Sequence, residues 1–139
     1  EKPYSLHLYS SAQLAPLVGT IPPLAAQLMQ RFWPGPLTIV MPAPDGKALG
    51  FRLPSHPVAL AFLKACGRLV VAPSANRSGF APPTDASEVR AALGSDFDCL
   101  LDGGPTPMGR ESTVVQVVGH QVVVLREGAI AREAILAAT

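Results

Sequence analysis

The chain has 139 residues, of which 48% are hydrophobic and 15% are charged. This balance predicts one globular domain with a substantial core and excludes a disordered protein. The formal net charge of +1 argues against a protein that coats a polyanion, although 11 lysines and arginines leave room for a local basic groove. Every apolar run is shorter than the roughly 18 residues of a membrane-spanning helix, so no membrane helix is expected.

Two cysteines, Cys66 and Cys99, lie far apart in apolar stretches of the sequence. This placement predicts two buried thiols in a reducing compartment, in preference to a disulfide or a metal-binding pair. The chain begins at Glu1 and shows no signal peptide. Together these features predict a cytoplasmic protein.

The hydrophobic pattern predicts strands and helices in alternation along the chain. Strands are expected over 4–10, 37–42, 49–54, 68–73 and 99–102, and a hairpin over 112–118 and 121–127 around Gly119-His120. Helices are expected after Thr20, over 56–67, over 85–94 and over 131–138. In the third of these, Asp85 is the expected N-cap and Glu88 lies at the capping-box position. We therefore expect an α/β or α+β fold, with helices flanking one twisted, partly antiparallel sheet, in a single domain over 1–139.

Four polar segments interrupt the apolar pattern where strands end or loops turn. They are residues 51–57, 72–79, 103–113 and 125–128, and each contains one arginine: Arg52, Arg77, Arg110 and Arg126. Arginines at strand ends suit phosphates or carboxylates, which the planar guanidinium can grip at two points. Each one could instead be solvated or paired with Glu111 or Glu127. Because Arg52 and Arg126 lie in otherwise apolar strands, the four together favour a ligand site.

Ser74 and Asn76 stand at alternate positions where a strand ends, so their side chains would point the same way in an extended chain. The pair could bind phosphate or carboxylate oxygens of a ligand, or could satisfy a turn of its own backbone. The spacing alone does not separate these two interpretations. A nucleophilic role for Ser74 is disfavoured because the G-x-S-x-G elbow is missing and no histidine has a triad context.

For the other polar candidates, a purely structural role is commoner than a functional one. His7 on a strand is most often structural, Ser112 and Thr113 most often just begin a strand, and Trp33 most often pins a proline-rich loop to the core. The three histidines are widely spaced and the sequence has no C-x-x-C or H-x-x-x-H pattern, so we predict no protein-built metal site. No P-loop motif is present either.

Taken in order, five segments resemble those of a known family. They are "RFWPGPLTIV", "FRLPSHP", "APSANRSGFAPPT", "DGGPTPMGRESTVV" and "VLREGAI". In order and spacing the chain resembles the YrdC-like threonylcarbamoyl-AMP synthases over nearly its whole length. The S-x-N triplet, the downstream P-T and the G-x-E-S-T-V segment together form the specific part of the signature.

The resemblance implies an enzyme that joins L-threonine, bicarbonate and ATP into threonylcarbamoyl-AMP and releases pyrophosphate. It implies threonine contacts at His7, Arg52, Ser74 and Ser112. It implies ATP contacts at Asn76, Thr84 and Arg126. Ser74 and Asn76 would lie closest to the reacting groups, in a site that positions and neutralises charge without a protein nucleophile.

The resemblance also implies partners and a cofactor. Mg²⁺ would be carried mainly by the ATP phosphates, and a separate transfer complex would deliver the threonylcarbamoyl group to tRNA. Family members have an N-terminal segment with a T-D-T-x-Y-G-L-like threonine pocket and a K-x-R nucleotide motif, neither of which is in this sequence. We therefore expect a YrdC-like domain that is incomplete at its N-terminus, inactive alone in the full reaction, and prone to dimerise through an uncovered edge.

Two other functions fit the same residues. One is the carbamoyl-adenylate-forming module of a larger carbamoyltransferase, which flanking sequence would identify. The other is a non-catalytic RNA-binding module, which would be supported by clustered basic residues interleaved with aromatic ones. The arginines stand singly in this sequence, so the RNA-binding module ranks lower.

Overall fold

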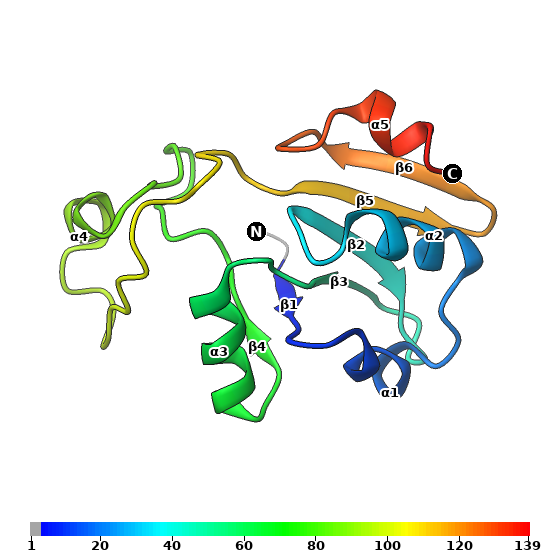
Figure 1. The fold of residues 1–139 in the computed structure, drawn as a ribbon, viewed down its shortest axis with the longest axis horizontal. Coiled ribbons are helices and arrows are strands. Elements are labelled where there is room, and N and C mark those ends of the chain that lie inside the picture. Colours follow the sequence, from blue (N-terminus) through cyan, green and yellow to red (C-terminus); the bar gives the residue numbers. More distant parts are fainter. Residues whose placement is uncertain (1–3) are drawn as a thin grey trace.

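The computed structural model describes residues 4–139 and contains one six-stranded sheet (Figure 1). The strands are β1 (Ser5–His7), β2 (Leu37–Pro42), β3 (Ala48–Arg52), β4 (Val70–Val71), β5 (Thr113–Val118) and β6 (Gln121–Arg126). The helices are the 3₁₀ turn η1 (Ser11–Gln13), α1 (Ala15–Val18), α2 (Pro23–Phe32), α3 (Pro57–Cys66), α4 (Ala86–Leu93) and α5 (Arg132–Leu136). None of these helices is long and apolar enough to cross a membrane.

The sheet is mixed, with strand order β4-β1-β3-β2-β5-β6. Strand β1 is parallel to β3, and β2 is parallel to β5. The pairs β1–β4, β2–β3 and β5–β6 are antiparallel. The expected partly antiparallel sheet is therefore confirmed, as is the hairpin around Gly119-His120.

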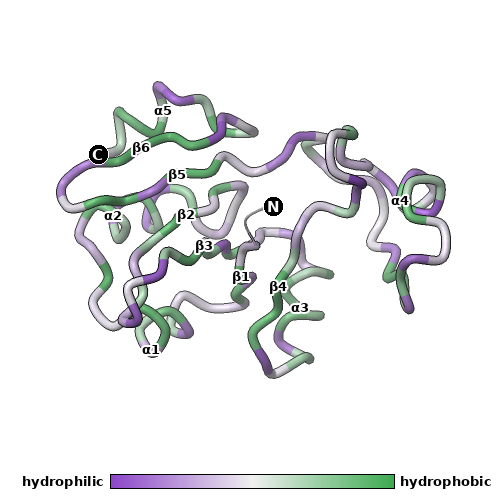
Figure 2. Tube along the Cα trace, turned by 180° about the vertical axis from the view of Figure 1, so that it is seen from behind, coloured by the Kyte–Doolittle hydropathy of each residue, from purple (hydrophilic) through white to green (hydrophobic). Residues whose placement is uncertain are grey.

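The main core lies on one face of the sheet, under α1, α2 and α5. The fully buried strand residues Phe51, Ile39 and Val115 pack there against Leu28 of α2 and Ile135 of α5. Figure 2 shows mostly hydrophobic chain along the strands β2, β5 and β6, and mixed polarity around α4. The core thus fixes the strands from one side and leaves their other face to carry polar groups.

Helix α4 and the loops on either side of it form a lobe beside the sheet, at the end opposite α2 and α5 (Figure 1). Helix α4 has no buried residue and depends on local bonds. The Asp85 side chain accepts a hydrogen bond from the Glu88 amide at 2.9 Å, as a capping residue should. The Glu88 carboxylate accepts the Thr84 amide at 2.6 Å, one residue before the expected capping-box partner. The Asp85 cap is thus confirmed, but the Glu88 side chain bonds the Thr84 amide and not the Asp85 amide that a capping box would use.

Helix α3 also begins and ends at the expected residues. His56 is its N-cap, with Nδ1 accepting the Val58 amide at 3.3 Å, and Pro57 occupies the first turn. Gly67 ends the helix with φ of 60°, a left-handed conformation that glycine adopts without strain.

Two expectations are wrong. Residues 99–102 are not a strand, because β4 and β6 hold the two sheet edges and Leu101 instead stands 62% exposed on the wall of a cavity. Cys66 and Cys99 are exposed, not buried. Cys66 lies in the last turn of α3, where only Leu63 is buried, and Cys99 lies in the lobe beside α4, which has little core of its own.

Candidate functional site

The sheet register brings four site residues to one face and one end of the sheet. His7 on β1 is the direct partner of Arg52 on β3. One step on from the Ile39–Phe51 pair, Arg52 lies opposite Thr38 on β2. Thr38 in turn pairs with Val114 on β5, and Val114 pairs with Arg126 on β6. Because directly paired residues project from the same face, His7, Arg52, Thr38 and Arg126 share the face opposite the core.

A bulge in β6 gives Arg126 this orientation. Val115 pairs with Val124, but the next residue, Val114, pairs with Arg126, so Leu125 is skipped. Regular alternation would have placed Arg126 on the same face as the half-buried Val122 and Val124. A bulge inserts one unpaired residue and re-aims the next side chain. This explains how an arginine can end an apolar strand without entering the core.

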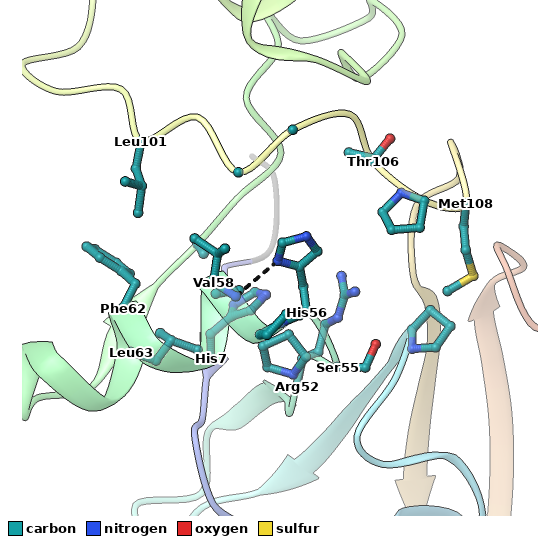
Figure 3. A pocket seen from close by; sticks show the side chains of 18 of the residues that line it. His7, Arg52, Ser55, His56, Val58, Phe62, Leu63, Leu101, Thr106 and Met108 are labelled. Atoms are coloured by element: carbon teal, nitrogen blue, oxygen red, sulfur yellow. Dashed lines mark hydrogen bonds between the residues drawn. The ribbon is translucent and has the colours of Figure 1, made fainter.

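A cavity of about 700 Å³ opens between the ends of β1 and β3, helix α3 and the loop over 101–110. His7 and Arg52 are its charged or ionisable groups from the sheet, and Ser55 and His56 approach from the start of α3. In Figure 3 Phe62 and Leu101 stand on one side and Met108 on the other. A guanidinium and an imidazole therefore face a mostly apolar space large enough for a small molecule.

His7 is held neutral in this cavity. Burial, followed by the nearby Arg52 charge, lowers the pKa of His7 from 6.5 to about 4, against a smaller opposing effect of the Ser5 backbone. Within the described part of the chain, the buried Nδ1 atom has no hydrogen-bond partner. A buried polar atom without a partner is costly, so Nδ1 is suited to bond a ligand.

Arg52 is a half-buried cation. Its Nε atom donates to the Gly35 carbonyl at 3.3 Å, which anchors the side chain to the loop before β2. Burial and the charge of Arg126 both lower the pKa of Arg52. Among residues 4–139 no carboxylate lies within ion-pair distance of it. The remaining guanidinium nitrogens therefore suit an anionic ligand group.

Ser112 and Arg126 form a second cluster, where β5 begins and β6 ends. Arg126 donates to the Ser112 carbonyl from Nη2 at 2.8 Å and from Nε at 3.2 Å. Its Nη1 atom lies 3.0 Å from a Glu111 carboxylate oxygen. The Ser112 hydroxyl lies 2.9 Å from the Thr38 hydroxyl and 3.3 Å from Arg126 Nη2. The hydroxyl and the guanidinium are thus fixed next to one another.

Thr113 fastens this cluster to the chain that follows β6. Its buried hydroxyl donates to the Ile130 carbonyl at 2.6 Å and accepts the Gly128 and Ile130 amides at 3.0 Å each. Gly128 lies so close to the backbone of Glu111 and Ser112 that a Cβ atom there would collide with both. The position of Ser112 therefore depends on a tight crossing of two backbones.

The loop with Ser74 and Asn76 follows β4 and leads toward α4 (Figure 1). The Asn76 amide donates to the Phe80 carbonyl at 2.7 Å and to the Arg77 carbonyl at 3.1 Å, which favours the turn interpretation for its donors. Arg77 ties the loop to the end of α4 through the Ala92 carbonyl and Asp96. Ala72 borders the large cavity, but neither Ser74 nor Asn76 belongs to its described lining.

Thr84 lies in the same lobe. Its amide and hydroxyl both donate to the Glu88 carboxylate, at 2.6 and 3.1 Å. Its carbonyl accepts the amide of Thr106, which lines the cavity. The sequence-predicted residues therefore fall into three groups: His7 with Arg52, Ser112 with Arg126, and the lobe residues Ser74, Asn76 and Thr84.

The four arginines divide between the two interpretations left open by the sequence. Arg126 pairs with Glu111, one of the two expected partners, and Arg77 pairs with Asp96, a partner that the sequence did not indicate. Arg52 and Arg110 both line the large cavity, and neither has an ion pair among the described residues. No group of three histidine, cysteine, aspartate or glutamate side chains in the described part of the chain could hold a metal.

Sequence reasoning missed Thr38. It stands inside the apolar run 37–42, where a single threonine is ordinary in a strand. Only its pairing with β5 brings its hydroxyl to Ser112, 74 residues along the chain. The segment 51–57 did signal Ser55 and His56, since both follow a strand end in a polar segment that now lines the cavity.

A family model described as telomere recombination, that of the Sua5, YciO and YrdC proteins, matches residues 1–128. The chain belongs to the Sua5/YciO/YrdC family. The threonylcarbamoyl-AMP synthase of Bacillus subtilis is 40% identical over 145 residues, covering 97% of this chain and 42% of that protein. The Pyrococcus abyssi threonylcarbamoyl-AMP synthase is 37% identical over 144 residues, with the same two coverages. The chain thus spans less than half the length of these two relatives of the Sua5/YciO/YrdC family.

Solved structures of the Sua5/YciO/YrdC family have the same fold. The crystal structure of P. abyssi Sua5 complexed with L-threonine matches with a TM-score of 0.91 at 36% identity, covering 99% of this chain and 43% of that one. Escherichia coli YciO matches with a TM-score of 0.80 at 25% identity, covering 91% of this chain and 66% of that one. The expected YrdC-like fold is confirmed.

Proposed function

We propose that this domain binds L-threonine and ATP and, together with an N-terminal segment like that of its relatives, forms threonylcarbamoyl-AMP from them and bicarbonate. Relatives of about 40% identity are threonylcarbamoyl-AMP synthases, and one similar structure holds L-threonine. The observation that carries the proposal is the pairing of Arg52 with a neutral His7 in one cavity. A cation and a neutral imidazole suit an amino acid, which brings a carboxylate together with hydrogen-bond donors.

Threonine would bind with its carboxylate on Arg52. The neutral His7 would accept a hydrogen bond at Nδ1 from the threonine ammonium or hydroxyl, which satisfies the buried atom. A protonated histidine would instead repel the ammonium group, so the lowered pKa of His7 serves this ligand. Ser112 would complete the contacts from the neighbouring cluster.

ATP would bind with its phosphates toward Arg126. His7 and Arg126 stand on strands four steps apart in the sheet, which is about 19 Å at the usual strand spacing. Arg52 lies one step from His7, between the two ends. Ser74, Asn76 and Thr84 would reach the nucleotide from the lobe. The sheet therefore offers an amino-acid end and a phosphate end in one line.

The reaction needs positioning and charge neutralisation. The threonine amine first attacks the bicarbonate carbon; a C–N bond forms, a C–O bond breaks, and a carbamate and water result. A carbamate oxygen then attacks the α-phosphorus of ATP, the bond to the β-phosphate oxygen breaks, and pyrophosphate leaves with the electron pair. Arginine charge beside the phosphate stabilises the transition state, and no protein nucleophile takes part.

Magnesium would accompany ATP. The described residues offer hydroxyls, an amide and arginines around the proposed site but no set of three metal-binding side chains, which fits an ion held mainly by phosphate oxygens. The product, threonylcarbamoyl-AMP, is a reactive mixed anhydride. We propose that a separate transferase uses it and moves the threonylcarbamoyl group to tRNA.

The test measures threonine binding and pyrophosphate release separately. Calorimetry should detect L-threonine binding to the chain, at least tenfold weaker in Arg52→Gln, and weaker binding of L-valine, which has the same shape without the hydroxyl. With the N-terminal segment of a threonylcarbamoyl-AMP synthase relative joined ahead of the chain, pyrophosphate release should require L-threonine, bicarbonate and ATP together and should fall in Arg126→Ala. Threonine binding that Arg52→Gln leaves unchanged would contradict the assignment of the cavity. Pyrophosphate release independent of threonine would contradict the proposed reaction.

A further inference from the structure

The proposed function assigns Arg126 to the nucleotide, but one nitrogen of Arg126 already pairs with a carboxylate of this chain, that of Glu111. The Glu111 carboxylate lies 3.0 Å from Arg126 Nη1, and both side chains are partly exposed. The other two nitrogens of Arg126 donate to Ser112 and hold the guanidinium in place independently of Glu111. Glu111 is therefore not needed to orient Arg126, and its main effect on the cluster is to neutralise charge.

The charge of Arg126 is felt elsewhere in the site. It lowers the pKa of Arg52, so the two cations lie near enough to repel each other. Glu111 is the one acid in an ion pair with Arg126 among residues 4–139. It also borders a small, open pocket of about 360 Å³ with Arg110, Glu127 and Gly128. The carboxylate thus stands where an anion could reach Arg126 from solvent.

We propose that Glu111 is an internal counter-ion that competes with the ATP phosphates for Arg126. This inference rests on the proposed function, because it takes Arg126 as a nucleotide contact. A phosphate oxygen and a carboxylate oxygen offer Nη1 the same kind of acceptor, and two anions at one guanidinium edge repel each other. Glu111 therefore lowers the affinity for ATP and keeps the Ser112–Arg126 cluster close to neutral when no anion is bound. It sets the affinity without contributing a contact to the ligand.

The experiment compares two isosteric charge removals at the same pocket. Binding of Mg-ATP and of inorganic tripolyphosphate is measured by calorimetry at low ionic strength for the chain, Glu111→Gln and Glu127→Gln. Glu127 borders the pocket too, but its carboxylate accepts the Arg132 amide and forms no ion pair in the described structure. Glu111→Gln should bind both anions about fivefold more tightly, on the scale of a partly exposed ion pair, and Glu127→Gln less than twofold.

Three outcomes would overturn the inference: Glu111→Gln binds the anions no more tightly, binds them more weakly, or gains no more than Glu127→Gln. Thermal unfolding confirms that each variant folds, and Glu111→Ala, which should show the same gain, replaces Glu111→Gln if that variant does not fold.

Arg126→Gln separates this inference from the proposed function. If Arg126→Gln binds ATP as tightly as the parent, Arg126 is not a nucleotide contact, and both this inference and the proposed function fail. If Arg126→Gln binds ATP weakly while Glu111→Gln shows no gain in affinity, only the role of Glu111 is wrong. In Glu111→Gln/Arg126→Gln the gain should vanish.

Discussion

His7 and Arg52 are direct partners across the parallel strands β1 and β3, and both side chains line the same cavity. The pairing puts the His7 imidazole next to the Arg52 guanidinium in a partly buried site. Burial acts first and the Arg52 charge second, and both favour the neutral imidazole. The protonation state of His7 is therefore a property of the fold, and it can be measured.

Acid should destabilise the chain through His7. The folded-state pKa of about 4 lies below the ordinary 6.5, so between these values the unfolded chain binds a proton that the folded chain does not. The contribution of His7 to stability is thus complete above pH 6.5 and is lost as the pH falls to 4, by about 2–3 kcal/mol. Urea unfolding at several pH values should show this slope, and His7→Gln should reduce it. An equal slope in His7→Gln would contradict the prediction.

Removing the Arg52 charge should raise the pKa of His7. In Arg52→Gln the pKa should move up from about 4 but stay below 6.5, because burial is the larger cause and remains. The pH titration of the His7 ring protons by NMR, compared between the parent and Arg52→Gln, measures it directly. A pKa that does not move would mean that the Arg52 charge is not felt at His7.

Thr38 should stabilise Ser112 through a single buried hydrogen bond. Thr38→Val keeps the shape but removes the partner that lies 2.9 Å from the Ser112 hydroxyl, and should lower the free energy of unfolding by about 1 kcal/mol. If Ser112 contacts threonine as proposed, threonine affinity should also fall several-fold. Thr38→Ser keeps the hydroxyl and should restore affinity. Thr38→Val with the stability and affinity of the parent would contradict this role.

The Thr113 hydroxyl should matter more for stability. Thr113→Val would leave the amides of Gly128 and Ile130 and the Ile130 carbonyl without their partner, at a cost of about 2–4 kcal/mol. Thr113→Ser removes only a methyl group and should cost about 1 kcal/mol. Urea unfolding of both variants tests the difference. Equal destabilisation by serine and valine would show that packing, and not the hydroxyl, is what counts.

Most of the fold could be predicted because its signals are local. Asp85 begins α4, Gly67 ends α3, and the alternation on either side of Gly119-His120 predicts the hairpin, each from a few neighbouring residues. The strand expected over 99–102 failed because an apolar run does not reveal whether a sheet edge is available. The expected burial of Cys66 was wrong for a related reason, since burial depends on what packs against α3.

The candidate site could be predicted only in part. Residue type and position marked Arg52 and Arg126, and the family resemblance added His7 and Ser112. The sheet brings these residues to one face. The Thr38–Ser112 bond and the close approach of Gly128 to Glu111 join segments far apart in sequence, so no local pattern reports them. The roles of all these residues as ligand contacts, and those of Ser74, Asn76 and Thr84, stay predictions.

The skipped residue in β6 makes the site unequally sensitive to changes in chain length. Loss of Leu125 would bring Arg126 directly after Val124, opposite Val114 as before, so the arginine would keep its side of the sheet. Strand β3 has no such slack, and loss of one residue ahead of Arg52 would turn that side chain into the core. Related chains can therefore vary in length in β6 ahead of Arg126, while β3 must keep its number of residues ahead of Arg52.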